Sequence, residues 1–261
     1  MSEENVKSEK STSSEVPKDS SRVRGRPRED YGYDYFPERF GKQEKPIWKR
    51  LFEGKEAARS FKCVSNVYSC AQSHAMVKLL LGALKSHGCP VDFPRHVSCE
   101  DCFAKVNGGF DPVNKQVVVC QNNSTSKGVC CSVLGHELTH MFDYCRAKVD
   151  FTNLEHLACT EIRAANFWHC SFATAWADGD ASPFNYKGQH QECVKKKAML
   201  SVLAVRDVDK ETARKVVDKV FDKCYNDLEP FGRIMRRKSR DAERALSEGF
   251  FYGYRDKVHI K

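Results

Sequence analysis

The sequence lacks a hydrophobic run long enough to cross a membrane. Its nearest approach, residues 75–84, is short and is interrupted by Lys78, whereas a membrane-spanning helix needs about 20 consecutive apolar residues. The first residues also lack the apolar run of a signal peptide, so we expect none before the cysteines. We therefore expect a protein that does not span a membrane by itself.

Aliphatic side chains are almost absent from the start of the chain, and residues 1–45 are rich in Ser, Glu, Lys and Pro. Such a composition cannot offset the entropy that is lost on ordering. We predict a disordered basic and polar tail over residues 1–45. Residues 46–261 are expected to form one domain, because a chain of 261 residues with 41% hydrophobic content can bury a core.

The tail contains Arg22-Val-Arg-Gly-Arg-Pro-Arg28. Its Arg-Gly-Arg-Pro core resembles the minor-groove element of AT-hook proteins, although a single copy favours a solvated basic linker or part of an unconventional mitochondrial targeting region. Early glutamates argue against an ordinary transit peptide. The formal net charge of +8 suits either membrane headgroups or nucleic acid. DNA binding by Arg22–Arg28 stays an alternative.

Cysteine is abundant, and its count of thirteen is odd, so at least one thiol is unpaired in a monomer. Cys89 with Cys99, and Cys120 with Cys130, have the spacing of proteins that are oxidised on entry to the mitochondrial intermembrane space. Two prolines inside the first pair exclude the continuous helix that such a motif needs. Cys99-Glu-Asp-Cys102 has no second Cys-x-x-Cys partner, which favours disulfides or buried thiols over a structural zinc site.

The clearest chemical signal is His136-Glu-Leu-Thr-His140, within a helix-compatible run over residues 126–145. Residues four apart share one face of a helix, so His136 and His140 can offer two imidazole nitrogens to one metal ion. Zinc lowers the pKa of a water molecule, and Glu137 is placed to take its proton and pass it to the leaving amine. The motif predicts a zinc hydrolase site with Glu137 as the catalytic base.

A surface helix with two unrelated histidines is the alternative interpretation of this motif. Two adjacent apolar stripes argue against it, because a helix that is apolar on two sides is buried and its histidines need partners. The first stripe contains Leu134, Leu138, Met141 and Cys145, and the second contains Val129 and Val133 beside His136, His140 and Asp143.

Periodicity predicts a helix over residues 67–87, with His74 on its apolar side as a core histidine. Runs of β-forming residues at 97–99, 104–110 and 116–121 predict an antiparallel hairpin or a small sheet. The last strand leads through hydroxyl residues, which are suitable N-caps, into the motif helix. An unpaired strand edge beside that helix would let an extended substrate add itself to the sheet.

A second helix, over residues 154–168 and capped by Thr152 or Asn153, is expected to carry the third metal ligand. Glu161 and His156 both have suitable chemistry, but five residues of helix place their side chains about 140° apart.

We favour Glu161 as the ligand, because the residues on its face are apolar and a buried carboxylate needs a metal or a partner. The residues that share this face are Leu154, Leu157, Ala158, Ala165 and Trp168, whereas His156 lies with Cys159, Thr160 and Arg163. An ion pair of Glu161 with Arg163 or Arg146 is the alternative.

The C-terminal part of the chain contains a loop at about residues 178–188 and helices at about 190–206 and 209–227 with solvated charged faces. A basic cluster follows, which is either an exposed helix face or a docking site for anionic lipid. Its members are Arg233, Arg236, Arg237, Lys238 and Arg240.

From about residue 60 to 255 the chain resembles the mitochondrial inner membrane metalloprotease family, which matures a subunit of the ATP synthase membrane sector and assists its assembly. The resemblance is carried by Gly108-Gly-Phe-Asp-Pro112, Gln116-Val-Val-Val-Cys-Gln-Asn122, Gly135-His-Glu-Leu-Thr-His-Met-Phe-Asp-Tyr-Cys-Arg146 and Glu155-His-Leu-Ala-Cys-Thr-Glu-Ile-Arg-Ala-Ala-Asn166.

The resemblance implies an α+β, zincin-like metallopeptidase domain with a short antiparallel sheet and several helices. It also implies one Zn²⁺ per chain, an ATP synthase subunit as protein substrate, and a peripheral position on the intermembrane-space side of the inner membrane. Two other classes stay open, namely a non-proteolytic assembly chaperone and a nuclear DNA-associated adaptor.

Overall fold

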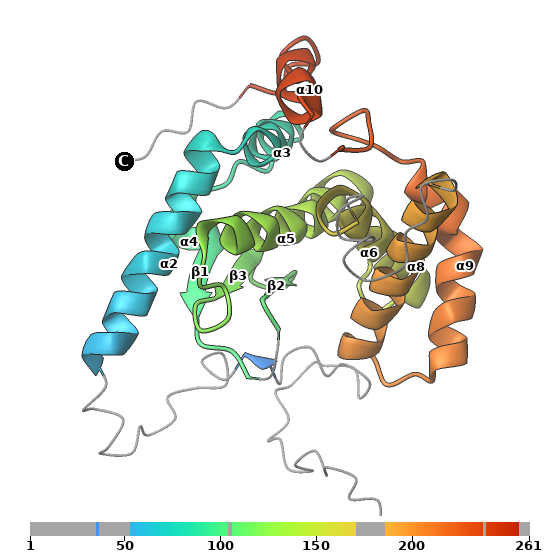
Figure 1. Ribbon diagram of the computed structural model, residues 1–261, viewed down its shortest axis with the longest axis horizontal. Coiled ribbons are helices and arrows are strands. Elements are labelled where there is room, and N and C mark those ends of the chain that lie inside the picture. The colour runs from blue at the N-terminus through green and yellow to red at the C-terminus, as the bar shows by residue number, and fades with distance from the viewer. Residues whose placement is uncertain (1–34, 37–52, 104–105, 171–185, 237–238, 256–261) are drawn as a thin grey trace, which may run out of the picture.

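The computed structural model describes residues 35–36, 53–103, 106–170, 186–236 and 239–255 (Figure 1). Nearly all of the predicted tail, its DNA-binding element and most of the predicted loop at 178–188 lie outside these ranges, so those expectations remain predictions. No helix in the described part of the chain is long and apolar enough to span a bilayer.

The fold is α+β, which confirms the predicted class. The elements in chain order are α2 (Glu53–Ser73), α3 (Ala75–Ser86), α4 (Phe93–His96), β1 (Val97–Glu100), β2 (Gly108–Asp111), β3 (Gln116–Cys120), α5 (Lys127–Ala147), α6 (Leu154–Trp168), α8 (Tyr186–Val205), α9 (Lys210–Tyr225) and α10 (Asp241–Gly249).

The sheet has the strand order β1-β3-β2. β2 and β3 form the expected antiparallel pair, with Phe110 opposite Val117, whereas β1 pairs with β3 in parallel, with Val97 opposite Val117. The central strand β3 is buried on both faces, because Val117, Val118 and Val119 are at most 1% exposed. β2 therefore forms one edge of the sheet, and it contacts α5.

The helix predicted over residues 67–87 is two helices. α2 ends at Ser73, His74 is extended with φ −87° and ψ 114°, and α3 starts at Ala75. The prediction of a continuous helix was wrong because the apolar stripe continues through the break, so periodicity does not reveal it. His74 packs its ring near Trp168, with 5.7 Å between the ring centroids.

α5 passes through the middle of the molecule, between α2 and α3 on one side and α6 on the other (Figure 1). It begins where Ser126 Oγ accepts a hydrogen bond from the Val129 amide, and most of its residues are buried, as predicted. Gly135 permits the contact with α6, since a Cβ there would lie 2.1 Å from the Trp168 ring. The indole N–H of Trp168 donates to Thr139 Oγ1 at 3.1 Å.

α6, α8 and α9 pack together around a second hydrophobic cluster beside the core on α5 (Figure 1). Asn153 caps α6 by accepting from the amides of Glu155 and His156, as one of the two predicted caps. The predicted helices at 190–206 and 209–227 are confirmed as α8 and α9.

Twelve of the thirteen cysteines pair in six disulfides, and the buried Cys130 is free. Neither pair with nine intervening residues is bonded, and the two cysteines of the Cys-x-x-Cys run have separate partners. The bonds are Cys63–Cys99, Cys70–Cys131, Cys89–Cys145, Cys102–Cys120, Cys159–Cys224 and Cys170–Cys193.

Candidate active site

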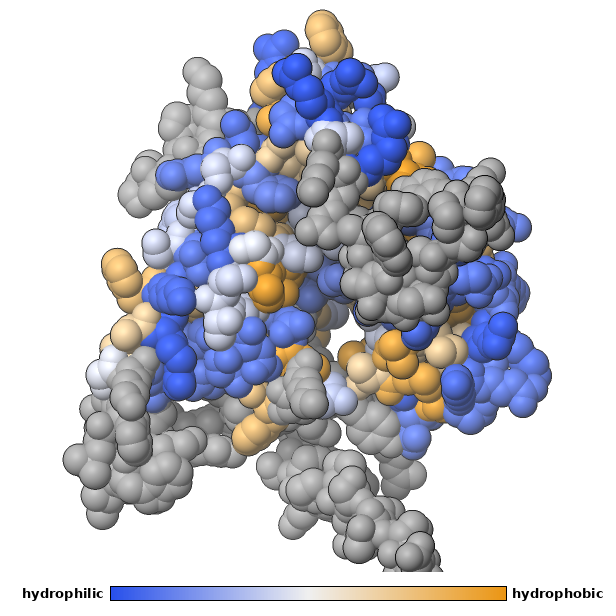
Figure 2. Space-filling model, viewed as in Figure 1, coloured by the Kyte–Doolittle hydropathy of each residue, from blue (hydrophilic) through white to orange (hydrophobic). Residues whose placement is uncertain are grey.

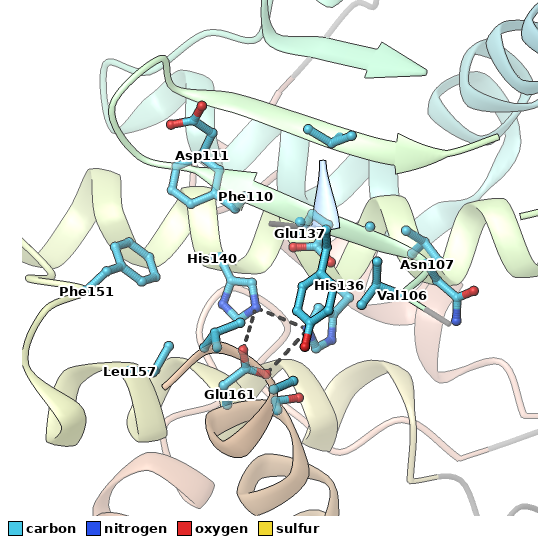
Figure 3. A pocket seen from close by; sticks show the side chains of 18 of the residues that line it. Val106, Asn107, Phe110, Asp111, His136, Glu137, His140, Phe151, Leu157 and Glu161 are labelled. Carbon is cyan, nitrogen blue, oxygen red and sulfur yellow. Dashed lines mark hydrogen bonds and ion pairs between the residues drawn. The ribbon is translucent and has the colours of Figure 1, made fainter. Parts of the chain in front are cut away.

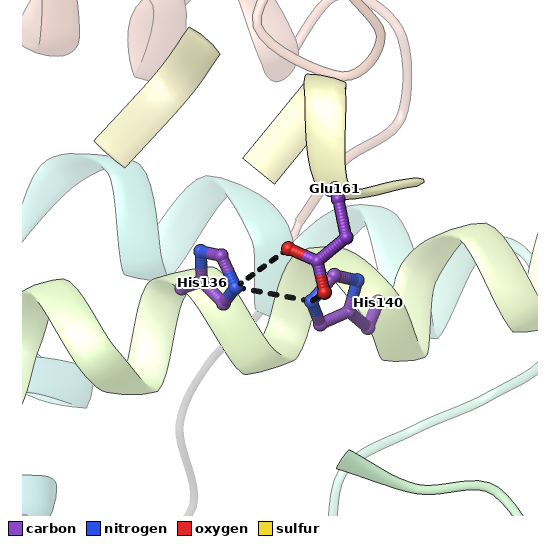
Figure 4. Close-up of side chains that lie close together, drawn as sticks. All are labelled: His136, His140 and Glu161. Carbon is purple, nitrogen blue, oxygen red and sulfur yellow. Dashed lines mark hydrogen bonds and ion pairs between the residues drawn. The ribbon is translucent and has the colours of Figure 1, made fainter. Parts of the chain in front are cut away.

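His136, His140 and Glu161 meet in the space between α5 and α6 (Figure 4). The Nε2 atoms of the two histidines are 3.1 Å apart. Glu161 Oε2 lies 3.5 Å from His136 Nε2, and Glu161 Oε1 lies 3.4 Å from His140 Nε2. Three ligand atoms from two helices thus form a small triangle.

This triangle fits a tetrahedral metal ion. Ligand bonds of about 2.0–2.1 Å at tetrahedral angles place neighbouring ligand atoms about 3.3–3.4 Å apart, close to the separations found here. Glu161 Oε2 is buried without a hydrogen-bond partner, and burial of such an atom is unfavourable unless something else binds it. The donor set of two imidazoles and one carboxylate therefore suits a metal cation.

The hydrogen-bond network behind His140 fixes which of its ring nitrogens carries the proton. Thr160 Oγ1 donates to Asp143 Oδ2 at 2.8 Å, so it can only accept the hydrogen bond that links it to His140 Nδ1 at 2.9 Å. His140 is then protonated on Nδ1, and its Nε2 lone pair faces Glu161 and His136. Asp143 is itself held by Arg163, whose Nε lies 3.0 Å from Oδ1.

His169 orients the other histidine. Its Nε2 lies 2.8 Å from His136 Nδ1, and burial lowers the pKa of His169 to about 3, so its neutral ring can accept a hydrogen bond from the N–H at His136 Nδ1. His136 Nε2 is then free to bind a metal. Sequence reasoning missed His169, Thr160 and the role of Asp143, although His169 follows Glu161 by eight residues, about two helical turns.

The ionisation states at the site follow from burial and from mutual attraction. Burial raises the pKa of Glu137 to about 7. Burial also opposes ionisation of Glu161, but His140 and His136 outweigh it and lower the Glu161 pKa to about 2. Burial lowers the pKa of His140 to about 4. Glu161 is therefore ionised near neutral pH, as a cation ligand must be.

A cavity of about 310 Å³ opens over the three ligand atoms and Glu137 (Figure 3). Glu137 lies between β2 and the ligand triangle, where a Cβ on Gly108 would be 3.3 Å from Glu137 Cγ. The edge of β2 and the C-terminal part of α8 form the walls of the cavity. Other lining residues include Tyr35, Phe36, Val106, Asn107, Gly109, Phe110, Asp111, Phe151, Leu157, Ser201, Ala204, Val205 and Arg206.

The structure separates the two candidates for the third ligand. Glu161 is 7% exposed and faces the histidines, whereas His156 is exposed, with its Nδ1 accepting from the Asp150 amide at 3.1 Å. The ion pair proposed as an alternative for Glu161 is not formed. Arg163 and Arg146 instead share Asp143, at 3.0 Å in each case.

One step in the assignment of helix faces was wrong. Thr160 and Arg163 were placed with His156 on the outer face, yet both are 1% exposed. Arg163 is buried because it has three partners, namely Asp143, the Asp227 carboxylate and the Glu229 carbonyl. A hydropathy pattern treats every arginine as a surface residue and does not reveal such partners.

Comparisons with known proteins show the family of this chain. Residues 61–232 match the Peptidase M76 family. The mitochondrial inner membrane protease ATP23 homolog of Danio rerio is 47% identical over 220 residues, or 82% of each chain. The Homo sapiens protein of that name is 44% identical over 215 residues, 78% of this chain and 81% of its own.

A fungal relative is more distant. The mitochondrial inner membrane protease atp23 of Schizosaccharomyces pombe is 36% identical over 161 residues, 61% of this chain and 85% of its own. No solved structure matches the chain. The family match spans more than half of the chain, and it confirms the family resemblance noted in the sequence. The chain belongs to the Peptidase M76 family.

Proposed function

We propose that this protein is a zinc-dependent endopeptidase of the mitochondrial inner membrane, with His136, His140 and Glu161 as zinc ligands and Glu137 as the catalytic base. The observation that carries the proposal is the convergence of three ligand atoms beside a cavity that also contains the Glu137 carboxylate. Two neutral imidazoles and one carboxylate partly neutralise Zn²⁺ and leave a fourth position open. We expect one zinc ion per chain.

Each part of the site has a separate role in peptide hydrolysis. A zinc ion would supply a Lewis acid for the peptide carbonyl and would make a water molecule easier to deprotonate. Glu137, whose carboxylate lines the same cavity as the three ligand residues, accepts that proton and passes it to the departing amine. The outer edge of β2, which pairs with no second strand among the described residues, is the edge to which an extended substrate adds, with its scissile bond over the ligands.

The relatives are named as proteases of the mitochondrial inner membrane, and we assign this chain to the same membrane. We place it peripherally on the intermembrane-space side. The six disulfides support this side, because disulfides persist in oxidising compartments and are rare where glutathione and thioredoxin keep thiols reduced. Its substrate, by family resemblance, is a subunit of the ATP synthase membrane sector, whose assembly it also assists.

The test compares Glu137→Gln with wild type in cells that lack the endogenous protein. The amide keeps the shape of the side chain but cannot accept a proton, so zinc content stays stoichiometric while cleavage falls by about 10²–10⁴-fold. Zinc is measured by mass spectrometry of the purified chain, and cleavage by the N-termini of the ATP synthase membrane-sector subunits. Glu211→Gln is the matched control, because this side chain is 76% exposed on α9.

Three outcomes separate the alternatives. Normal N-termini with Glu137→Gln would refute proteolysis of these subunits. Normal ATP synthase assembly together with uncleaved N-termini would assign the assembly role to a chaperone activity of the same chain. Recovery of the protein chiefly from nuclei would favour a DNA-associated adaptor.

A further inference from the structure

Three consecutive aromatic side chains project into solvent directly after α10. Phe250, Phe251 and Tyr252 are 43%, 88% and 76% exposed, although phenylalanine is among the residues most often buried. We call residues 250–252 the aromatic tip. In Figure 2 hydrophobic and hydrophilic surfaces lie side by side at the end of the molecule that α10 forms.

The aromatic tip is held outward by an ordered turn. The amides of Tyr252 and Tyr254 both donate to the Gly249 carbonyl, at 3.1 and 2.9 Å, and Gly253 adopts a φ of 84°, which favours glycine. The side chain of Tyr254 packs back against the hydrophobic core, and its hydroxyl donates to Glu229 Oε1 at 3.2 Å. The exposure of the three rings thus belongs to the folded state.

α10 has one face against the protein and one against solvent. Asp241, Ala245 and Gly249, each four residues apart, are buried, and a Cβ on Gly249 would lie 2.3 Å from Leu79 of α3. The solvent face runs along the helix at intervals of four, three and four residues. It contains Arg240, Arg244, Ser247 and Phe251.

The charges beside the aromatic tip are unequally neutralised. Arg233 pairs with Glu248, and Arg236 pairs with Asp241, so two members of the basic cluster already have carboxylate partners. Arg240 and Arg244 are exposed and pair with no carboxylate in the described part of the chain. Glu243 is exposed on the same helix, so Arg240, Arg244 and Glu243 together leave one net positive charge beside the exposed aromatic rings.

We propose that this face, formed by the aromatic tip with Arg240 and Arg244, is the surface by which the protein docks onto an anionic phospholipid bilayer. This inference rests on the proposed attachment to the inner membrane, and it names the surface of the protein that makes the attachment. Aromatic side chains settle at the level of the headgroups, and each arginine near an anionic surface strengthens binding about fivefold. In Figure 1 α10 lies away from β2 and the lower end of α8, so docking leaves the cavity accessible.

The experiment is flotation of the purified full chain with phosphatidylcholine vesicles that contain or lack phosphatidylserine. We expect wild type to float with the anionic vesicles only, and less so at high salt. Arg240→Gln with Arg244→Gln weakens binding roughly 30-fold, and Phe251→Ser with Tyr252→Ser weakens it at least about tenfold.

Two matched controls remove similar groups elsewhere. Phe61→Ser with Val64→Ser removes apolar side chains that are 78% and 40% exposed on α2. Arg214→Gln with Lys215→Gln removes two charges that are each 74% exposed on α9. Both controls are expected to bind vesicles as wild type does, and circular dichroism verifies that all variants fold.

The proposal is overturned if wild type does not bind anionic vesicles, a result that would indicate a protein receptor. It is also overturned if the α10 variants bind these vesicles as tightly as wild type. Cleavage of ATP synthase subunits, followed separately as described above, reports on the proposed function. A failure of the docking surface is therefore distinguishable from a failure of the protease assignment.

Discussion

The molecule has two halves that are stabilised in different ways. The sheet half comprises α2, α3, the sheet and α5, and it contains four disulfides. The bundle half comprises α6, α8 and α9, and it contains two. No disulfide joins the halves, yet the sheet half supplies both histidines and Glu137, and the bundle half supplies Glu161. The triangle of His136, His140 and Glu161 therefore spans a joint that no disulfide crosslinks.

Buried charge holds this joint in register. Arg163 of the bundle half pairs with Asp143 of the sheet half at 3.0 Å, and Arg146 of the sheet half reaches Asp227 and Glu229, beyond α9, at 2.5 and 2.9 Å. Asp143 also accepts from Thr160, which orients His140. The contacts that align the halves thus also orient one of the ligands, and this coupling can be tested.

Of the two arginine substitutions at this joint, Arg163→Met should produce the larger loss of stability. It leaves Asp143 buried without its main partner, and removing one member of a buried pair costs about 3–5 kcal/mol. Arg146→Met should cost less, because Arg146 is 16% exposed where Arg163 is 1% exposed. Urea unfolding measures both values. Equal losses would show that the joint does not depend on Arg163 in particular.

Removing one long-range disulfide from each half should cost similar stability but loosen different helices. Cys70–Cys131 and Cys159–Cys224 close loops of 61 and 65 residues, so loop entropy predicts about 4 kcal/mol for each double Cys→Ala variant. Hydrogen exchange should rise in α2 and α5 for the first and in α6 and α9 for the second.

The matched control for these variants is Cys130→Ala, which removes the buried free thiol and breaks no crosslink. Faster exchange throughout the molecule in both double variants would contradict the division into halves, since it would mean that the protein opens as one unit.

Much of the sheet half and of α6 could be predicted from sequence, because local rules determine those features. The four-residue spacing of His136 and His140, the cap at Asn153 and the apolar face of Glu161 all follow from helix geometry. The structure brings the three ligand residues together as that reasoning expected. The break at His74 and the parallel pairing of β1 were missed, because each depends on contacts between segments that are distant in sequence.

The disulfide pairing and the outer partners of the histidines could not be predicted either. Pairing depends on which Cα atoms the fold brings within bonding distance, and thirteen cysteines permit many arrangements. Arg163 was placed on the outer face for a similar reason, since the carboxylates that compensate its burial come from α5 and from the chain beyond α9.

Glu161, the proposed zinc ligand of the bundle half, can be distinguished by experiment from His156 on the same helix. Glu161→Ala should weaken zinc binding by more than about 100-fold, beyond the effect of losing an outer-shell partner, because a direct ligand is removed. His156→Ala, on the same helix but exposed, should leave zinc stoichiometric. Competition with a chromophoric chelator measures both. If the two results were reversed, the metal would bind on the other face of α6.

The smallest effect on zinc affinity is expected from His169 and Thr160, which orient the proposed ligands His136 and His140 without being ligands themselves. The effect of removing either residue should be similar. His169→Phe removes the acceptor 2.8 Å from His136 Nδ1, and Thr160→Val removes the acceptor 2.9 Å from His140 Nδ1. Each should weaken zinc binding about 10–100-fold while leaving the fold intact.

His156→Phe is the matched control, because it makes the same substitution at an exposed histidine. Thr160 also donates a hydrogen bond to Asp143, which pairs with Arg163. Thr160→Val removes this bond and should therefore lower the free energy of unfolding as well, whereas His169→Phe should not. Zinc affinity by chelator competition and unfolding by urea separate these effects. Unchanged affinity in both variants would mean that the helices alone orient the two histidines.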